Sequence, residues 1–325
     1  MSKIAVVGID IGGTKTFCVL VNKQSRILKS LKFKTAGNEG CKQFTRHLLE
    51  AVSSLRDAGL AKGYRFAGIG IGFAGSIDQK TGVLKSSPNL LCLEGFPLRR
   101  FLEKEFKTQV ILGNDVQTGI MGEFKLGSAK GCENALGVFF GTGVGGAAII
   151  GGKLYTGASG FGGQVGSILA QPVGGPKAAL SHGIVDRIAS KSAITTEALV
   201  MAIKDWAPYL HRKVDSDLSK VTWGMLKKAI EHKDERIEEM LRARMRVVGI
   251  ALASVVNFMN PEVLVLGGGL VSELPKLVLT EVEAGLREYL VPEVSEALKI
   301  KTALLGGAAV ALGAASAALE NRNKH

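Results

Sequence analysis

Two glycine- and threonine-rich segments have the composition of phosphate-binding turns. The first is residues 8–16, GIDIGGTKT, and the second is residues 139–147, FFGTGVGGA. Each segment joins two apolar stretches, as the turn of a β-hairpin does, and a turn with few side chains lets backbone N–H groups approach phosphate oxygens. Two such turns in separate halves of the chain, the first with a carboxylate at Asp10, predict two related lobes that bind a polyphosphate between them.

The composition is that of a globular protein long enough for two domains. The 325 residues are 46% hydrophobic, 22% charged and 6% aromatic, and none of the apolar stretches is a clean membrane span. No secretory segment precedes the first predicted strand, so we expect a cytoplasmic protein without a membrane partner. The four cysteines lack C-x-x-C spacing, which predicts neither a disulfide framework nor a thiolate metal site.

The formal net charge of +12 is concentrated in the first third of the chain. Residues 1–116 hold 18 Lys and Arg against 9 Asp and Glu, whereas the remainder holds 23 against 20. A basic surface can bind nucleic acid. The lysines here alternate with strand residues and lack aromatic stacking partners, so we expect no nucleic-acid partner and interpret them as a solvated surface that attracts anionic substrates.

The order of the predicted elements indicates an α/β protein. In the first part we expect strands at residues 4–9, 16–21, 26–34, 67–72 and 109–112, with helices at 41–59 and 117–126. In the second part we expect strands at residues 135–140, 147–150 and 263–266, helices at 184–207, 222–231, 234–260 and 275–286, and a loop at 208–220.

Seven collinear motifs resemble those of the ROK group of sugar kinases, within the actin-like ATPase superfamily that also holds hexokinases. They are residues 10–15 (DIGGTK), 70–78 (GIGFAGSID), 87–90 (SPNL), 113–115 (GND), 141–146 (GTGVGG), 157–163 (GASGFGG) and 266–270 (LGGGL). The resemblance implies two RNase H-like lobes around a central cleft, at residues 1–116 and 117–305. It also implies a final helix, at about 306–325, that packs on the first lobe, and a homodimer.

The resemblance implies ATP and Mg²⁺ as cofactors, because phosphoryl transfer needs amide cradles, a divalent metal and a base for the attacking hydroxyl. Asp10 would hold Mg²⁺ through water. The donor site would comprise the two turns, with Gly268 and Gly269 beside the adenosine. The residues expected in the turns are Gly12, Gly13, Thr14 and Lys15 in the first, and Gly141, Thr142 and Gly143 in the second.

Asp115 is the predicted general base, since a carboxylate between a strand and a helix can take the proton of a sugar hydroxyl. A helix N-cap is the alternative role at this position, and both roles could hold together. By the resemblance, Asn89 and Asn114 would bind sugar hydroxyls, and Gly75 would line the same pocket.

The chain departs from the family pattern in the sugar pocket. Gln164 replaces a carboxylate that contacts the sugar in relatives, Ser167 replaces a histidine, and Asp186 replaces a glutamate that is one methylene longer. Many relatives carry a cysteine-rich zinc motif directly afterwards. Residues 170–183 contain no cysteine, and a lone histidine cannot hold tetrahedral zinc, so we expect no structural zinc.

The sequence therefore predicts an ATP- and Mg²⁺-dependent kinase that phosphorylates a hexose, with O6 of glucose as the expected acceptor. Alternatives within the family are an N-acetylhexosamine or fructose kinase, or one that uses polyphosphate instead of ATP. A further alternative is a sugar-sensing regulatory or binding protein with weak catalysis. Only three residues precede the first predicted strand, so such a regulator would act without its own DNA-binding segment.

Overall fold

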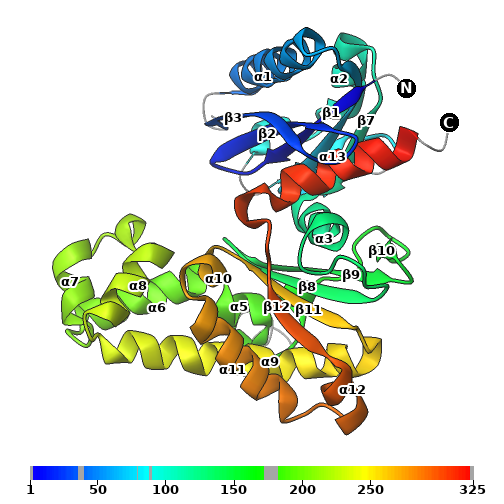
Figure 1. Cartoon of the computed structure of the whole chain (residues 1–325). Helices are drawn as coiled ribbons and strands as arrows, with labels where there is room; N and C mark the ends of the chain where they lie inside the picture. Colours follow the sequence, from blue (N-terminus) through cyan, green and yellow to red (C-terminus); the bar gives the residue numbers. More distant parts are fainter. Residues whose placement is uncertain (1–2, 36–39, 79, 88–89, 172–181, 323–325) are drawn as a thin grey trace. The chain divides into compact units, whose positions relative to one another are not determined.

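The computed structural model describes residues 3–35, 40–78, 80–87, 90–171 and 182–322 of the chain. The chain folds into two compact units. Unit 1 comprises Met1–Gly131 and Gly307–His325, and unit 2 comprises Cys132–Gly306. Each unit is built on a five-stranded sheet with helices packed against it, so the fold has the predicted α/β class (Figure 1).

The sheet of unit 1 combines an antiparallel meander with parallel strands. In spatial order its strands are β3 (Ile27–Lys34), β2 (Lys15–Asn22), β1 (Ile4–Ile11), β4 (Arg65–Phe73) and β7 (Val110–Asn114). β1 is antiparallel to β2 and parallel to β4, and β4 is parallel to β7. The carboxyl ends of β1, β4 and β7 therefore meet at one edge of the sheet. A small hairpin of β5 (Ser76–Ile77) and β6 (Leu84–Ser86) follows β4.

The two faces of this sheet carry different side chains because residues alternate along a strand. Ile9 and Ile11 lie in a core with α1 (Cys41–Ala61) and α2 (Leu98–Phe106). The opposite face carries glycines, and a Cβ atom at Gly8 or Gly70 would overlap a backbone carbonyl of the last helix, α13 (Ala309–Arg322). The glycines thus let this alanine-rich helix lie directly on the strands (Figure 1).

Helix α3 (Asp115–Leu126) belongs to unit 1, although the sequence-based boundary after residue 116 placed it in the second lobe. The physical reason is its close packing against α13. A Cβ at Gly122 would overlap the Ala309 carbonyl oxygen, and one at Gly313 would overlap that of Thr118. Glycines on both helices allow this approach, which a boundary drawn from motif positions did not include.

The sheet of unit 2 has the same mixed arrangement. In spatial order its strands are β10 (Lys153–Tyr155), β9 (Val144–Ile150), β8 (Ala135–Phe140), β11 (Val263–Gly268) and β12 (Lys299–Thr302). β8 and β9 form an antiparallel hairpin, and β8, β11 and β12 run parallel. Phe140 and Gly268 are paired across the strands, so β8 and β11 end at the same edge.

The helices of unit 2 enclose one large apolar core. They are α5 (Val185–Ala189), α6 (Lys191–Ile203), α7 (Pro208–Val214), α8 (Trp223–Glu231), α9 (Glu235–Met259), α10 (Gly269–Glu273), α11 (Pro275–Arg287) and α12 (Pro292–Ala297). Short 3₁₀ turns occur in unit 1 at Leu91–Leu93, in unit 2 at Val165–Ser167 and Leu218–Lys220, and where the chain returns from unit 2 to unit 1 at Gly306–Ala308.

Two sequence-based expectations for this unit were wrong. The helix predicted at 184–207 is split, because Ser190 is extended and its side chain caps α6 through the Ala193 N–H at 3.3 Å. The loop predicted at 208–220 begins with α7. Its first turn is stabilised by the carboxylate of the distant Asp234, which accepts hydrogen bonds from the N–H groups of Tyr209 (3.0 Å) and Leu210 (2.8 Å).

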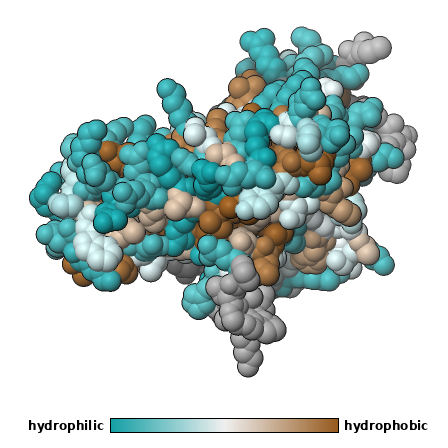
Figure 2. Space-filling view, turned by 90° about the horizontal axis from the view of Figure 1, so that it is seen from below, coloured by the Kyte–Doolittle hydropathy of each residue, from teal (hydrophilic) through white to brown (hydrophobic). Residues whose placement is uncertain are grey.

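The surface mixes hydrophilic and apolar side chains, as the face drawn in Figure 2 shows. Phe258 near the end of α9 is 91% exposed, and Leu304 after β12 is 71% exposed. Within the described ranges, no helix combines the length and the apolarity that a bilayer crossing requires.

Candidate active site

Two carboxylates lie at the edge of the unit 1 sheet where the parallel strands end. Asp10 is the penultimate residue of β1, and Asp115 begins α3 directly after β7. The register aligns Asp10 with Gly72 of β4, and Gly72 with Gly113 of β7. Both aspartates are half-buried. Open sheets of this kind bind ligands beyond the carboxyl ends of their strands.

Asn114 holds the carboxylate of Asp115 in place. Its Oδ1 accepts hydrogen bonds from the N–H groups of Val116 (3.0 Å) and Gln117 (3.2 Å), so Asn114 is the N-cap of α3. Its Nδ2 donates to Asp115 Oδ1 at 2.9 Å and to the Gly75 carbonyl at 3.3 Å. The capping role weighed for Asp115 therefore belongs to its neighbour, and the Asp115 carboxylate projects from the first residue of the helix.

Burial raises the pKa values of both carboxylates. Desolvation, then repulsion from Asp115, raises the pKa of Asp10 to about 7, while the positive charge of Lys32 opposes this. Burial raises the pKa of Asp115 to about 6, against hydrogen bonds from the backbone N–H of Val116 and the Asn114 side chain. Carboxyl groups with pKa values near neutrality are typical of acid–base sites.

The first turn connects β1 to β2 and is held by a hydrogen bond from a residue outside the turn. The Gly12 N–H donates to the Lys15 carbonyl at 3.2 Å and closes the turn. Thr35 follows β3, and its hydroxyl donates to the Gly12 carbonyl at 2.7 Å. In the described part of the chain, the N–H groups of Gly13 and Thr14 have no hydrogen-bond partner. These two adjacent amides can therefore bind an anion.

The second turn connects β8 to β9 in unit 2 and repeats this pattern. The Gly141 N–H donates to the Gly143 carbonyl at 2.8 Å. The N–H of Val144, just beyond the turn, donates to Asp186 Oδ1 at 2.7 Å. Across the described residues, the amides of Thr142 and Gly143 and the Thr142 hydroxyl lack partners, so they form the second anion-binding group.

Gly268 and Gly269 lie between β11 and α10, at the same edge as the second turn. Gly268 has φ 90°, a conformation that favours glycine, and a Cβ there would overlap the Phe140 carbonyl. A Cβ at Gly269 would lie 2.7 Å from Trp223 Cδ1 at the start of α8. Both glycines thus serve close packing around the strand end.

The structure distributes the predicted sugar-contact residues over both units. Gly75 lies in unit 1, where a Cβ would overlap the Ser86 carbonyl, and Asn89 falls outside the described residues. In unit 2 the Gln164 side chain is exposed, and Asp186 is hydrogen-bonded to the second turn.

Sequence reasoning missed two polar residues around the first turn. Thr35 fastens the turn, and Lys32 lowers the pKa of Asp10. Cross-strand pairing accounts for the second effect, because Asp10 is opposite Phe17 and Phe17 is opposite Lys32. For Lys32 the signal was its position in the third predicted strand, where the charge count treated it as part of a solvated surface; Thr35 lies just beyond that strand.

The donor set of unit 1 fits Mg²⁺ held with additional ligands from substrate and water. Repulsion from Asp115 raises the pKa of Asp10, and a divalent cation would relieve that repulsion. Among the described residues, no cluster of three or more His, Cys, Asp or Glu side chains could hold a metal alone. Mg²⁺ is usually bound through one or two carboxylates plus phosphates, which matches this set.

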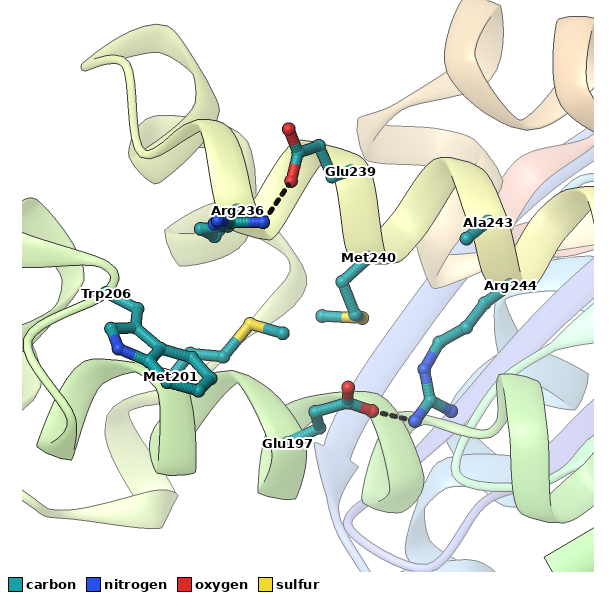
Figure 3. A pocket seen from close by; sticks show the side chains of 8 residues that line it. All are labelled: Glu197, Met201, Trp206, Arg236, Glu239, Met240, Ala243 and Arg244. Atoms are coloured by element: carbon teal, nitrogen blue, oxygen red, sulfur yellow. Dashed lines mark hydrogen bonds and ion pairs between the residues drawn. The ribbon is translucent and has the colours of Figure 1, made fainter.

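A cavity of about 590 Å³ lies elsewhere, between α6 and α9 of unit 2 (Figure 3). Met201 and Met240 point into it, and two ion pairs, Arg236–Glu239 and Arg244–Glu197, flank it. None of the predicted site residues lines this cavity. Its size alone therefore does not make it the reaction site.

The comparison with protein families decides the classification. The model of the ROK family matches residues 6–321. The chain belongs to the ROK family. It is 28% identical to a glucokinase of Thermotoga maritima over 317 residues, which cover 97% of this chain and 98% of the relative.

Solved ROK structures share the fold over almost the whole chain. A ROK hexokinase from Thermus thermophilus superposes with a TM-score of 0.82 at 30% identity, covering 99% of this chain and 100% of its own. A ROK family glucokinase from Streptomyces griseus in complex with glucose and AMPPNP gives 0.80 at 28% identity, covering 97% and 99%. The predicted fold is confirmed. Regulators are also relatives, such as NagC of Escherichia coli, a DNA-binding transcriptional dual regulator, at 24% identity over 86% of this chain and 66% of its own length.

Proposed function

We propose that this protein is a sugar kinase that transfers the γ-phosphoryl group of ATP to a hydroxyl of a hexose, with O6 of glucose as the acceptor. The observation that carries the proposal is the half-buried carboxylate of Asp115, whose raised pKa suits a base and whose orientation Asn114 fixes. The relatives named as glucokinases, one of them solved with glucose and AMPPNP, support the substrate class and the donor.

In this mechanism each residue has one task. Asp115 accepts the proton of the attacking hydroxyl as the new bond to phosphorus forms, and the ADP oxygen leaves with the electron pair of the broken bond. The unpartnered amides at Gly13 and Thr14 and those at Thr142 and Gly143 bind phosphate oxygens. Asp10 would hold Mg²⁺, which supplies positive charge to the phosphates.

A coupled assay of ADP release across hexoses and N-acetylhexosamines, with ATP and Mg²⁺, tests the proposal. We expect turnover on glucose, and we expect Asp115→Ala to lower kcat by roughly 10²–10⁴-fold, the usual contribution of a positioned base. Binding of AMPPNP should persist in this variant. Near-wild-type turnover of Asp115→Ala would remove that residue from the role of base, and turnover only on another sugar would change the acceptor.

A sugar-sensing regulatory protein is the second candidate, because regulators such as NagC are relatives of the chain. Sugar binding without ADP release on any acceptor would favour this candidate. Retention of both Asp10 and Asp115 at the strand ends favours the kinase, since a sensor needs neither a base nor a metal ligand.

We also propose that the protein is a homodimer. Phe258 is 91% exposed, and the neighbouring Asn257 binds the segment of Tyr289 and Val291, which are 58% and 47% exposed. These apolar side chains favour self-association of unit 2. Sedimentation equilibrium should give twice the chain mass of 34.2 kDa, and a single-chain mass would contradict the proposal.

A further inference from the structure

Asp186 lies at the family position of a sugar-contacting glutamate, yet its carboxylate is bonded to the second turn. Oδ1 accepts the Val144 N–H at 2.7 Å, a distance typical of a charge-assisted hydrogen bond. Asp186 belongs to α5, where Val185 and Ala189 on either side are completely buried in the core of unit 2. The backbone that carries this carboxylate is therefore anchored in the core of unit 2.

The surrounding glycines make room for this contact. A Cβ at Gly143 would lie 2.7 Å from Asp186 Oδ1, and a Cβ at Gly166 would overlap the Val144 carbonyl. Alanine at either position would force the carboxylate and the turn apart. The local sequence thus fits the hydrogen bond on both sides of Val144.

The same short segment of the chain holds the other side of the turn. The N–H of Lys191, the first residue of α6, donates to the Gly141 carbonyl at 3.0 Å. Within this segment, the Ser190 N–H donates to the Asp186 carbonyl at 3.1 Å. Residues 186–191 therefore hold the turn at both ends, with one hydrogen bond to Gly141 at its start and another to Val144, the first residue of β9.

We propose that Asp186 is a positioning residue of the phosphoryl-donor site, which orients the Thr142 and Gly143 amides toward the phosphates of a nucleoside triphosphate. Because Asp186 occupies the Val144 N–H and the Gly143 carbonyl occupies the Gly141 N–H, the turn is left with two adjacent donors. This inference rests on the proposed kinase function and refines its donor site. It also gives Asp186 a task other than the sugar contact implied by the resemblance.

A positioning role and a purely electrostatic role of Asp186 predict opposite effects of its removal on nucleotide binding. A carboxylate near a bound polyphosphate repels it, so removal of the charge alone should strengthen nucleotide binding. Loss of the hydrogen bond should instead weaken binding, because the turn loses its fixed conformation before the ligand arrives. Alanine removes the charge and the acceptor, whereas asparagine removes only the charge and keeps an oxygen that can accept the Val144 N–H.

The experiment is isothermal titration of AMPPNP with Mg²⁺ into the full-length wild type, Asp186→Ala and Asp186→Asn. We expect alanine to weaken binding about tenfold, as loss of one charge-assisted hydrogen bond would, and asparagine to bind at least as tightly as the wild type. Glu296→Ala removes an exposed carboxylate on α12 and should leave the dissociation constant unchanged. Circular dichroism verifies that each variant is folded.

A second readout does not depend on nucleotide. Hydrogen-exchange mass spectrometry of the peptide that spans the turn should show faster exchange in Asp186→Ala and near-wild-type exchange in Asp186→Asn. In turnover assays, alanine should raise the KM for ATP and leave the KM for the sugar unchanged.

The outcomes distinguish failure of this inference from failure of the proposed function. An unchanged dissociation constant for AMPPNP in Asp186→Ala, with a raised KM for the sugar alone, would overturn the inference and make Asp186 a sugar contact. Wild-type protein that binds AMPPNP but turns over no sugar would contradict the kinase, while the titrations would still decide the role of Asp186. Wild-type protein that does not bind AMPPNP would overturn both.

Discussion

At the scale of single residues, the proposed base Asp115 is distinct from the group that orients it. The pKa of Asp115 is raised, as is that of Asp10, and Asn114 both caps α3 and donates a hydrogen bond to the Asp115 carboxylate. In unit 2, Asp186 has the corresponding supporting task for the second turn. Asp115 and the second turn are therefore each held by a polar neighbour through a defined hydrogen bond.

The raised pKa of Asp115 predicts the pH dependence of turnover. A base acts only when ionised, so with saturating Mg²⁺, which keeps Asp10 ionised, kcat/KM for the sugar should fall about tenfold per pH unit below the Asp115 pKa of about 6 and level off above it. An unshifted carboxyl would move this fall toward pH 4, near the ordinary value of 3.8. The measurement is a pH profile of kcat/KM from pH 4.5 to about pH 9, the range over which an acidic limb and a plateau separate.

The conservative variant Asp115→Asn provides the control for this profile. It keeps the size of the side chain but cannot accept a proton, so its residual activity should lack the limb near pH 6. A wild-type profile that is flat down to pH 4.5 would contradict the assignment of Asp115 as the base.

At the scale of elements, the glycines of the unit 1 sheet decide how closely α13 can approach. Gly68 and Gly70 lie on the same face of β4 beneath this helix. A Cβ at Gly70 would overlap the Ala314 carbonyl, whereas a Cβ at Gly68 would meet the Ala318 Cβ at an ordinary 3.6 Å. Two nearby glycines on the same face of β4 therefore differ in how closely the backbone of α13 approaches them.

Alanine substitutions at Gly70 and Gly68 therefore form a matched pair of variants. Gly70→Ala should lower the free energy of unfolding by about 1–3 kcal/mol or more, because a backbone carbonyl must shift. Gly68→Ala should be neutral or stabilise by about 0.5 kcal/mol, since alanine loses less conformational entropy in a strand than glycine. Urea denaturation monitored by circular dichroism measures both, and equal effects of the two substitutions would contradict the packing argument.

At the scale of the whole molecule, the chain is a ROK member whose described residues offer no metal-binding cluster of His, Cys, Asp and Glu side chains. Residues 172–181, which the structure does not describe, contain none of these four residue types. The fold of unit 2 instead rests on one continuous apolar core. We predict that metal dependence arises from the reaction and not from folding.

Metal removal tests this separation. A zinc-selective chelator should leave the melting temperature unchanged, and elemental analysis should find no stoichiometric zinc. EDTA should abolish turnover, and an excess of Mg²⁺ should restore it fully, because Mg²⁺ acts on the bound phosphates. A fall in melting temperature of several degrees with the zinc chelator would show a structural zinc site and contradict the prediction.

The sequence by itself determined the class of fold and the positions of the two turns. Turns of glycine and threonine between apolar stretches are local features, and the order of the seven motifs, which include these two turns, indicated the family that the comparison then showed. The positions of Asp10 after an apolar strand and of Asp115 between a strand and a helix were predicted from local patterns of the same kind.

Only the tertiary structure decided which residues hold the two turns and the helix ends in place through hydrogen bonds and packing. The bond from Val144 to Asp186 joins residues 42 positions apart, and that from Thr35 to Gly12 joins residues 23 apart. Asp234 stabilises the start of α7 from a distance of 24 residues along the chain, so a segment expected to be a loop became a helix. The assignment of α3 to unit 1 likewise depended on glycines of α3 and α13 that meet only after folding. Such contacts are fixed by the packing of whole elements, and no local pattern specifies them.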